Sequence, residues 1–199
     1  MDKTDRSIYF QRTSTVTVIS PRTPVAAPAL SRLYAARFVF ALVWALIVLL
    51  SEGDIGFFLG ALLVLYPVYD IAAVAADVRL SNPGTSRSGL YANLVVSAGA
   101  AVGIAIAAGS GIPAVLRVFG AWAIVAGVAQ LVVGLRRRAM GGQLPMVISG
   151  GVSVLAGGSF IAMASKEDSS LSALGGYALL GGIFFLVSSI LLRRRSHKA

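Results

Sequence analysis

Apolar residues along this chain gather into six long segments, separated from one another by short polar or charged stretches. The segments are Tyr34–Leu50, Ile55–Val78, Leu90–Ala108, Ile112–Leu135, Leu144–Ser165 and Leu171–Leu192. At 1.5 Å per residue, each is close to the length that a helix needs to cross the roughly 30 Å hydrocarbon core of a bilayer. The pattern predicts an all-α, polytopic membrane protein with six transmembrane helices.

Composition agrees with this pattern. Hydrophobic residues make up 57% of the chain and charged residues 13%, with a mean hydropathy of +0.83, whereas a soluble domain carries roughly a quarter charged residues. The net charge of +9 invites a nucleic-acid interpretation. However, the basic residues lie at the ends of apolar segments rather than on a basic face interleaved with aromatics. No nucleic-acid partner is therefore expected.

The distribution of charge between the loops predicts the orientation. Lysine and arginine crowd one set of connections, which includes Arg79–Arg87, Arg136–Arg138 and Arg193–Arg195. The opposite connections are short and contain Glu52, Asp54, Glu167 and Asp168. Because basic loops stay on the cytoplasmic side, both termini are predicted to be cytoplasmic.

The N-terminal stretch differs from the rest of the chain. Residues 1–31 are polar and contain Pro21, Pro24 and Pro28, which break any long helix. We expect a flexible cytoplasmic tail over residues 1–31, a transmembrane domain over 32–195, and a short cytoplasmic tail over 196–199.

An internal repeat divides the apolar part into helix pairs. The segment GAWAIVAGVAQLV (Gly120–Val132) resembles GGYALLGGIFFLV (Gly175–Val187), and Leu94–Val102 resembles Met146–Val154. The chain is therefore predicted to consist of three tandem two-helix hairpins, each beginning and ending in the cytoplasm. Their bounds are 33–79, 89–138 and 143–195.

The first hairpin matches the other two more loosely. Pro67 stands where the second hairpin has Gly127, and Asp70 stands where it has Gln130. The first hairpin is thus the divergent copy, and its differences introduce a proline and a carboxylate into an apolar span.

Glycines recur every seven residues in the later segments, which places them on one face of each helix. They are Gly120, Gly127 and Gly134, then Gly150 and Gly157, then Gly175 and Gly182. Gly151 and Gly158 form a second stripe on the fifth segment. Because small residues let helices approach closely in lipid, we expect tight packing within the bundle. The alternative is a sliding interface or a substrate path, and the glycine faces also allow a homo-oligomer.

A family resemblance rests on three features of the sequence. They are the six short spans, the tandem hairpins and the segment AVLRVFGAWAIVAGVAQLVVGLRRR (Ala114–Arg138). Over about Leu33–Arg195, the chain resembles the HdeD-type short-repeat membrane proteins, which are associated with bacterial acid resistance. The resemblance implies a multi-pass protein of the bacterial inner membrane with a stress-related role. It brings no active-site residues, and Asp70 lies outside the shared pattern.

Asp70 is the most unusual residue of the apolar part, because a carboxylate near the middle of a span costs about 2.5–3.5 kcal/mol. By the helical rise, Asp70 lies about 4 Å and Arg37 about 8 Å to the cytoplasmic side of the midplane. Arg117 lies more than about 10 Å from Asp70 in depth by the same rise. Arg37 is therefore the expected partner, while Arg117 is expected to extend to the interface.

Other polar residues fall in the same half of the membrane. The predicted intramembrane polar cluster comprises Asp70, Arg37, Tyr66, Asp77, Asn93 and Gln130. Three interpretations stay open for its centre. They are a hydrogen-bonded clasp between Arg37 and Asp70, a proton or solute site on Asp70, and a protonated, neutral Asp70.

The usual catalytic groupings are missing from the sequence. The single histidine, His197, stands in the charged C-terminal tail, where it cannot activate a serine in a span and offers one donor where a metal site needs several. No phosphate loop or dinucleotide fingerprint is present, and the chain has no cysteine. We therefore expect no enzyme, no metal and no cofactor.

The expected partner is the bilayer itself, with anionic lipids at the arginine clusters. The leading hypothesis is a non-enzymatic HdeD-type inner-membrane protein with a structural or stress-related role. The alternative is a small transporter or proton-conducting protein that uses Asp70.

Overall fold

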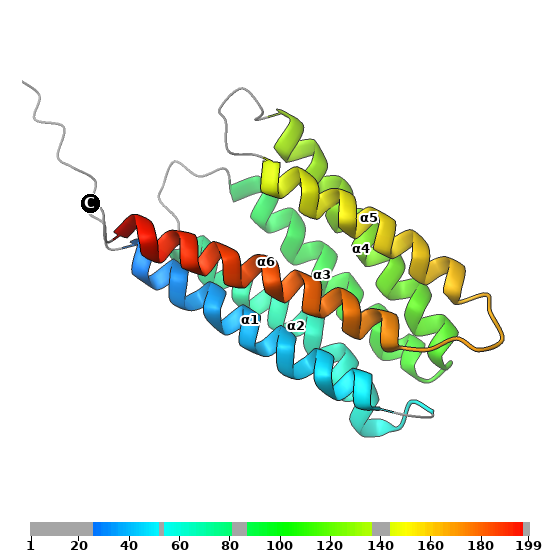
Figure 1. The fold of residues 1–199 in the computed structure, drawn as a ribbon. Helices are drawn as coiled ribbons and strands as arrows, with labels where there is room; N and C mark the ends of the chain where they lie inside the picture. The colour runs from blue at the N-terminus through cyan, green and yellow to red at the C-terminus, as the bar shows by residue number, and fades with distance from the viewer. Residues whose placement is uncertain (1–25, 52–53, 81–86, 137–143, 197–199) are drawn as a thin grey trace, which may run out of the picture.

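The structure is a computed structural model, and it describes residues 26–51, 54–80, 87–136 and 144–196. Its helices run along the long axis of the molecule (Figure 1). They are α1 (Ala26–Leu50), α2 (Phe57–Leu80), α3 (Arg87–Ala108), α4 (Ile112–Arg136), α5 (Leu144–Met163) and α6 (Ser172–Ser196). All six are long and apolar enough to cross a membrane, and the described residues contain no strand. The prediction of an all-α protein with six membrane-spanning helices is confirmed by length and composition.

Helix α1 begins earlier than predicted, at Ala26. Pro28 lies in its first turn, where the missing N–H would have had no partner in the helix. Pro28 therefore starts this helix instead of breaking it, and the expectation of a flexible tail is wrong for residues 26–31. Residues 1–25 and 197–199 lie outside the described residues, so the tail prediction for them stays a prediction.

The closest helix pairs join different predicted hairpins. Helix α1 lies against α6, α2 against α3, and α4 against α5, whereas α5 and α6 pack loosely (Figure 1). In each close pair, an even-numbered helix contacts the odd-numbered helix of the next hairpin, with α6 returning to α1. Weaker contacts within each hairpin complete a closed ring of six helices.

Helices α4 and α5 approach backbone to backbone. A Cβ atom added to Gly120 would lie 2.6 Å from the carbonyl oxygen of Gly157, and one added to Gly127 would lie 2.6 Å from that of Gly150. Carbon and oxygen do not approach so closely without a bond, so the contact requires glycine. We call Gly120, Gly127, Gly150 and Gly157 the glycine seam.

The other glycines divide into two groups. Gly134 continues the contact between α4 and α5, and Gly175 and Gly182 face α1. A Cβ atom on Gly151 or Gly158 would instead meet nothing within 4 Å. Packing within the bundle was expected for this second stripe on α5 as well, and that expectation is wrong because the stripe faces away from the other helices.

The centre of the ring is filled by large apolar side chains. Trp44, Leu63, Ile104, Leu116 and Leu174 come from five different helices and are almost fully buried. Many other large apolar side chains point outward on every helix, far beyond the isolated patches of a soluble monomer. This pattern suits a bundle whose outer surface faces lipid.

Candidate functional site

Asp70 of α2 is held by side chains from two neighbouring helices. Its Oδ1 accepts a hydrogen bond from Nη2 of Arg37 on α1 at 2.5 Å. Its Oδ2 accepts bonds from Nδ2 of Asn93 at 3.0 Å and from Oγ of Ser97 at 2.8 Å, both on α3. We call these four residues the polar clasp. It occupies both carboxylate oxygens and joins three helices at one point.

Helical spacing explains how these donors come together. Asn93 and Ser97 are four residues apart, so they lie one above the other on one face of α3. On the other side, the guanidinium carbon of Arg37 lies 4.2 Å from the ring centroid of Phe185 on α6, within range of a cation–π interaction. Arg37 therefore contacts both α2 and α6, which fixes its charge opposite Asp70.

The polar clasp is largely shielded from its surroundings. The side chains of Arg37 and Asp70 are 12% and 18% exposed. The cavity beside them has a volume of about 20 Å³, and one water molecule needs roughly 10–15 Å³. Since small-molecule sites usually measure about 300–1,000 Å³, this cavity has room for a water molecule and not for a solute.

Aromatic rings line the same junction. Tyr69 stacks on Phe40 with ring centroids 3.8 Å apart. Tyr66, one turn before Asp70, packs against Trp44 at a centroid distance of 4.6 Å and meets Trp122 edge-on at 5.9 Å. Each such pair contributes about 0.5–1.5 kcal/mol beyond its buried area. Tyr66 thus belongs to an aromatic cluster, and it is not a hydrogen-bond partner of Asp70 within the described residues.

Pro67 marks a second polar contact between α1 and α2. Proline has no N–H to bond the carbonyl of Leu63, and its ring crowds that turn of the helix. At the adjacent position, the carbonyl oxygen of Leu62 accepts a hydrogen bond from Nε1 of Trp44 at 2.7 Å. The buried indole is therefore satisfied by the backbone of α2, one turn before the proline.

Two predicted members of the polar cluster lie elsewhere. Gln130 of α4 faces α5, where its Cβ lies 3.1 Å from the position of a Cβ added to Gly150. Its Oε1 is buried and has no hydrogen-bond partner among the described residues. Asp77 lies two turns beyond Asp70 on α2 and interacts electrostatically with Tyr34 of α1. Neither residue bonds the carboxylate of Asp70.

Ser97 is the member of the polar clasp that the prediction lacked. The sequence signal that could have identified Ser97 is its position four residues after Asn93, which places both on one face of the helix. Arg37 and Asn93, which were predicted, do bond Asp70. Arg117 instead donates from Nη2 to the carbonyl oxygen of Ala164 at 3.3 Å.

A further unpredicted contact joins the beginning of α1 to the end of α6. Oγ of Ser31 donates to the carbonyl oxygen of Ser189 at 3.0 Å, and Oγ of Ser189 donates to the carbonyl oxygen of Ser31 at 2.8 Å. Nε of Arg193 donates to Oγ of Ser31 at 3.2 Å. This contact exists because α1 is longer than predicted, and it fixes the register of α1 against α6.

Comparison of the chain with protein-family models, with curated proteins and with solved structures finds no match. The chemistry of the site is therefore argued from its geometry.

The geometry favours a closed ion pair over a reactive group. Asp70 faces a fixed cation and two neutral donors, so both of its oxygens already have partners inside the bundle. No group of three or more His, Cys, Asp or Glu side chains that could hold a metal is found within residues 26–51, 54–80, 87–136 and 144–196. What the polar clasp can do in this arrangement is hold α1, α2 and α3 together.

Proposed function

We propose that this chain is a non-enzymatic, multi-pass protein of the bacterial inner membrane, of the HdeD type, in which the polar clasp is a structural lock. The observation that carries the proposal is the carboxylate of Asp70, which accepts three hydrogen bonds beside a cavity of about 20 Å³. Intramembrane charges commonly pair with one another in this way. The stress-related role implied by the family resemblance is part of the proposal.

The proposal places both termini in the cytoplasm. One end of the bundle, where α1 begins and α6 ends, has exposed arginines at Arg32, Arg79, Arg136, Arg193 and Arg194. The opposite end has exposed acidic residues at Asp54, Glu167 and Asp168 and one exposed lysine, Lys166. The excess of arginine at the first end supports the orientation, because basic residues are concentrated on the cytoplasmic side. A reporter fused after Lys198 should therefore read cytoplasmic, and an external reading would contradict the topology.

Three tandem hairpin repeats are also part of the proposal. The ring of helices supports them, since the close pairs are related by a shift of one hairpin. Gly120 of α4 and Gly175 of α6 occupy matching positions in the repeat, and each faces the odd-numbered helix of the following hairpin. This shared packing supports the proposed repeat.

The structural role is tested by replacing Asp70 with asparagine, which keeps the shape of the side chain and removes its charge. Asp70→Asn leaves Arg37 without its counter-charge, so we expect a marked loss of thermal stability in detergent micelles. The charge exchange Arg37→Asp with Asp70→Arg should restore part of the loss. Proton and solute flux in proteoliposomes should not change in either variant.

A matched control is Asp168→Asn, which removes the same charge from an exposed position at the other end of the bundle. Its thermal stability should equal that of the unmodified protein. Flux that disappears in Asp70→Asn while the fold is retained would overturn the structural role in favour of transport or proton conduction. Unchanged stability together with unchanged flux would also contradict the proposal.

A further inference from the structure

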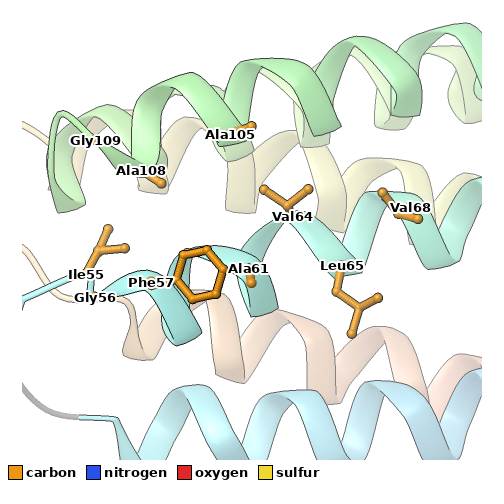
Figure 2. A pocket seen from close by; sticks show the side chains of 11 residues that line it. Ile55, Gly56, Phe57, Ala61, Val64, Leu65, Val68, Ala105, Ala108 and Gly109 are labelled. Atoms are coloured by element: carbon orange, nitrogen blue, oxygen red, sulfur yellow. The ribbon is translucent and has the colours of Figure 1, made fainter.

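An apolar groove lies between α2 and α3, and its lining includes no residue of the polar clasp. It runs beside the first half of α2 and the last turns of α3, at the end of the bundle opposite the chain termini (Figure 2). Its volume is about 550 Å³. Ala61, Val64, Ala105 and Ala108 line it, and no charged side chain does.

The dimensions of the groove restrict what can fill it. From Phe57 to Val68, the groove follows about 17 Å of α2 by the helical rise, which is close to half of the roughly 30 Å hydrocarbon core. Dividing the volume of about 550 Å³ by this length gives a cross-section of roughly 30 Å², which corresponds to a width of roughly 6 Å. The groove therefore has the length of one leaflet and is narrow.

Two apolar occupants are available within a membrane, a helix and a hydrocarbon chain. A helix with its side chains is about 10–12 Å across, so only its side chains, and not its backbone, could enter this groove. An unbranched hydrocarbon chain is about 4–5 Å across, given carbon contacts of roughly 3.5–4 Å, and it fits. The width thus suits a single extended chain along the whole groove, whereas a second protein helix would contribute only separate side chains.

The end of the groove at the beginning of α2 indicates the headgroup. Ile55, Gly56 and Phe57 form this end, and the exposed Asp54 directly precedes them in the chain. Phe57 is 95% exposed at this end of the groove. A carboxylate at this position attracts an ammonium group and repels a headgroup of net negative charge.

We propose that this groove is a specific binding site for one acyl chain of a phospholipid with an ammonium headgroup. The chain lies between α2 and α3 over one leaflet, with its headgroup beside Asp54. This site goes beyond the proposed structural function, because it does not depend on the polar clasp.

The test is a titration of the full-length protein in mild detergent with phosphatidylethanolamine, followed by native mass spectrometry. One lipid should bind more tightly than all later ones, and phosphatidylglycerol should bind this first site more weakly. Ala105→Phe fills the groove from the exposed face of α3 and should weaken the first binding step about tenfold, as expected when roughly two buried CH₂ groups lose their contacts. If Ala105→Phe does not fold, Ala61→Phe fills the groove from α2.

The matched control is Ala98→Phe, two turns earlier on the same exposed face of α3 and outside the groove. It should leave the first binding step unchanged. Equal weakening by both variants, or the absence of any distinct first step, would overturn the site in favour of ordinary surrounding lipid. Tighter binding of phosphatidylglycerol would overturn the assigned headgroup.

A second measurement separates a lipid from a second copy of the chain. The chain has no cysteine, so Ala105→Cys provides a single thiol in the groove. Under mild oxidation in a bilayer, this variant should remain monomeric because a lipid chain covers the thiol. Efficient disulfide-linked dimers would show that another copy of the protein occupies the groove and would overturn the proposal.

Discussion

The glycine seam between α4 and α5 and the polar clasp of α1, α2 and α3 hold helices together in opposite ways. In the seam, side chains are absent, and a single added Cβ atom would lie 2.6 Å from a carbonyl oxygen. In the clasp, side chains reach across the gap, and one carboxylate accepts three hydrogen bonds. Packing in the seam therefore requires residues without a side chain, whereas the clasp requires each of its polar side chains.

This difference follows from the membrane as solvent. Lipid tails are as apolar as leucine, so burying leucine between two helices gains little. Close dispersion contacts and interhelical hydrogen bonds remain as the sources of specificity. In the proposed repeat, Gly127 and Gln130 of α4 correspond to Pro67 and Asp70 of α2. Under this proposal, equivalent positions of two hairpins use the two different solutions.

The largest effect should come from removing the cation of the polar clasp. Arg37→Met leaves the carboxylate of Asp70 shielded from solvent without its counter-charge, a change that typically costs about 3–5 kcal/mol. The free energy of unfolding in detergent micelles should fall by this amount.

The double variant Arg37→Met with Asp70→Leu sharpens this test. Replacing both charges by apolar groups is often close to neutral, so most of the lost stability should return. The stability that does not return would measure the contribution of the hydrogen bonds that Asn93 and Ser97 lose. A double variant as unstable as Arg37→Met alone would show that the ion pair is not the source of the loss.

A smaller effect is expected in the glycine seam. Gly127→Ala introduces a Cβ atom 2.6 Å from the backbone oxygen of Gly150, so α4 and α5 must move apart. Overpacking of this kind costs about 1–3 kcal/mol. Gly158→Ala is the matched control, because its Cβ meets nothing within 4 Å and alanine favours a helix over glycine by about 1 kcal/mol. Equal unfolding free energies for the two variants would contradict the close packing of α4 and α5 at the glycine seam.

The sequence predicts both regions for physical reasons that can be named. Span length and apolar content suffice to identify six helices. The seven-residue glycine period identifies the face of α4 that the seam uses. Depth along the membrane identifies Arg37 as the partner of Asp70, since two charges at similar depth on neighbouring helices can meet.

Other features of the fold could not be predicted from the sequence. The connections between helices suggest that neighbours in a hairpin pack most closely, but α4 contacts α5 more closely than α3, because backbone approach at glycines decides the packing. Pro28 was expected to break a helix, and its place in the first turn depends on where the helix begins. The outward direction of Gly151 and Gly158 depends on the rotation of α5, which the period alone does not give.

Ser97 provides the smallest and most specific test of the comparison. A serine in a membrane helix is ambiguous from sequence, because its hydroxyl often bonds a carbonyl of its own helix. Ser188 does so with Phe184 at 2.8 Å, whereas Ser97 crosses to Asp70 at 2.8 Å. Interhelical hydrogen bonds in a membrane are worth about 0.6 kcal/mol on average and up to about 1.7 kcal/mol, so Ser97→Ala should lower the free energy of unfolding within this range. Ser188→Ala removes the same hydroxyl without breaking a contact between helices and should change stability less. If both losses are equal, the third donor of the polar clasp adds nothing, and Arg37 and Asn93 alone stabilise the carboxylate.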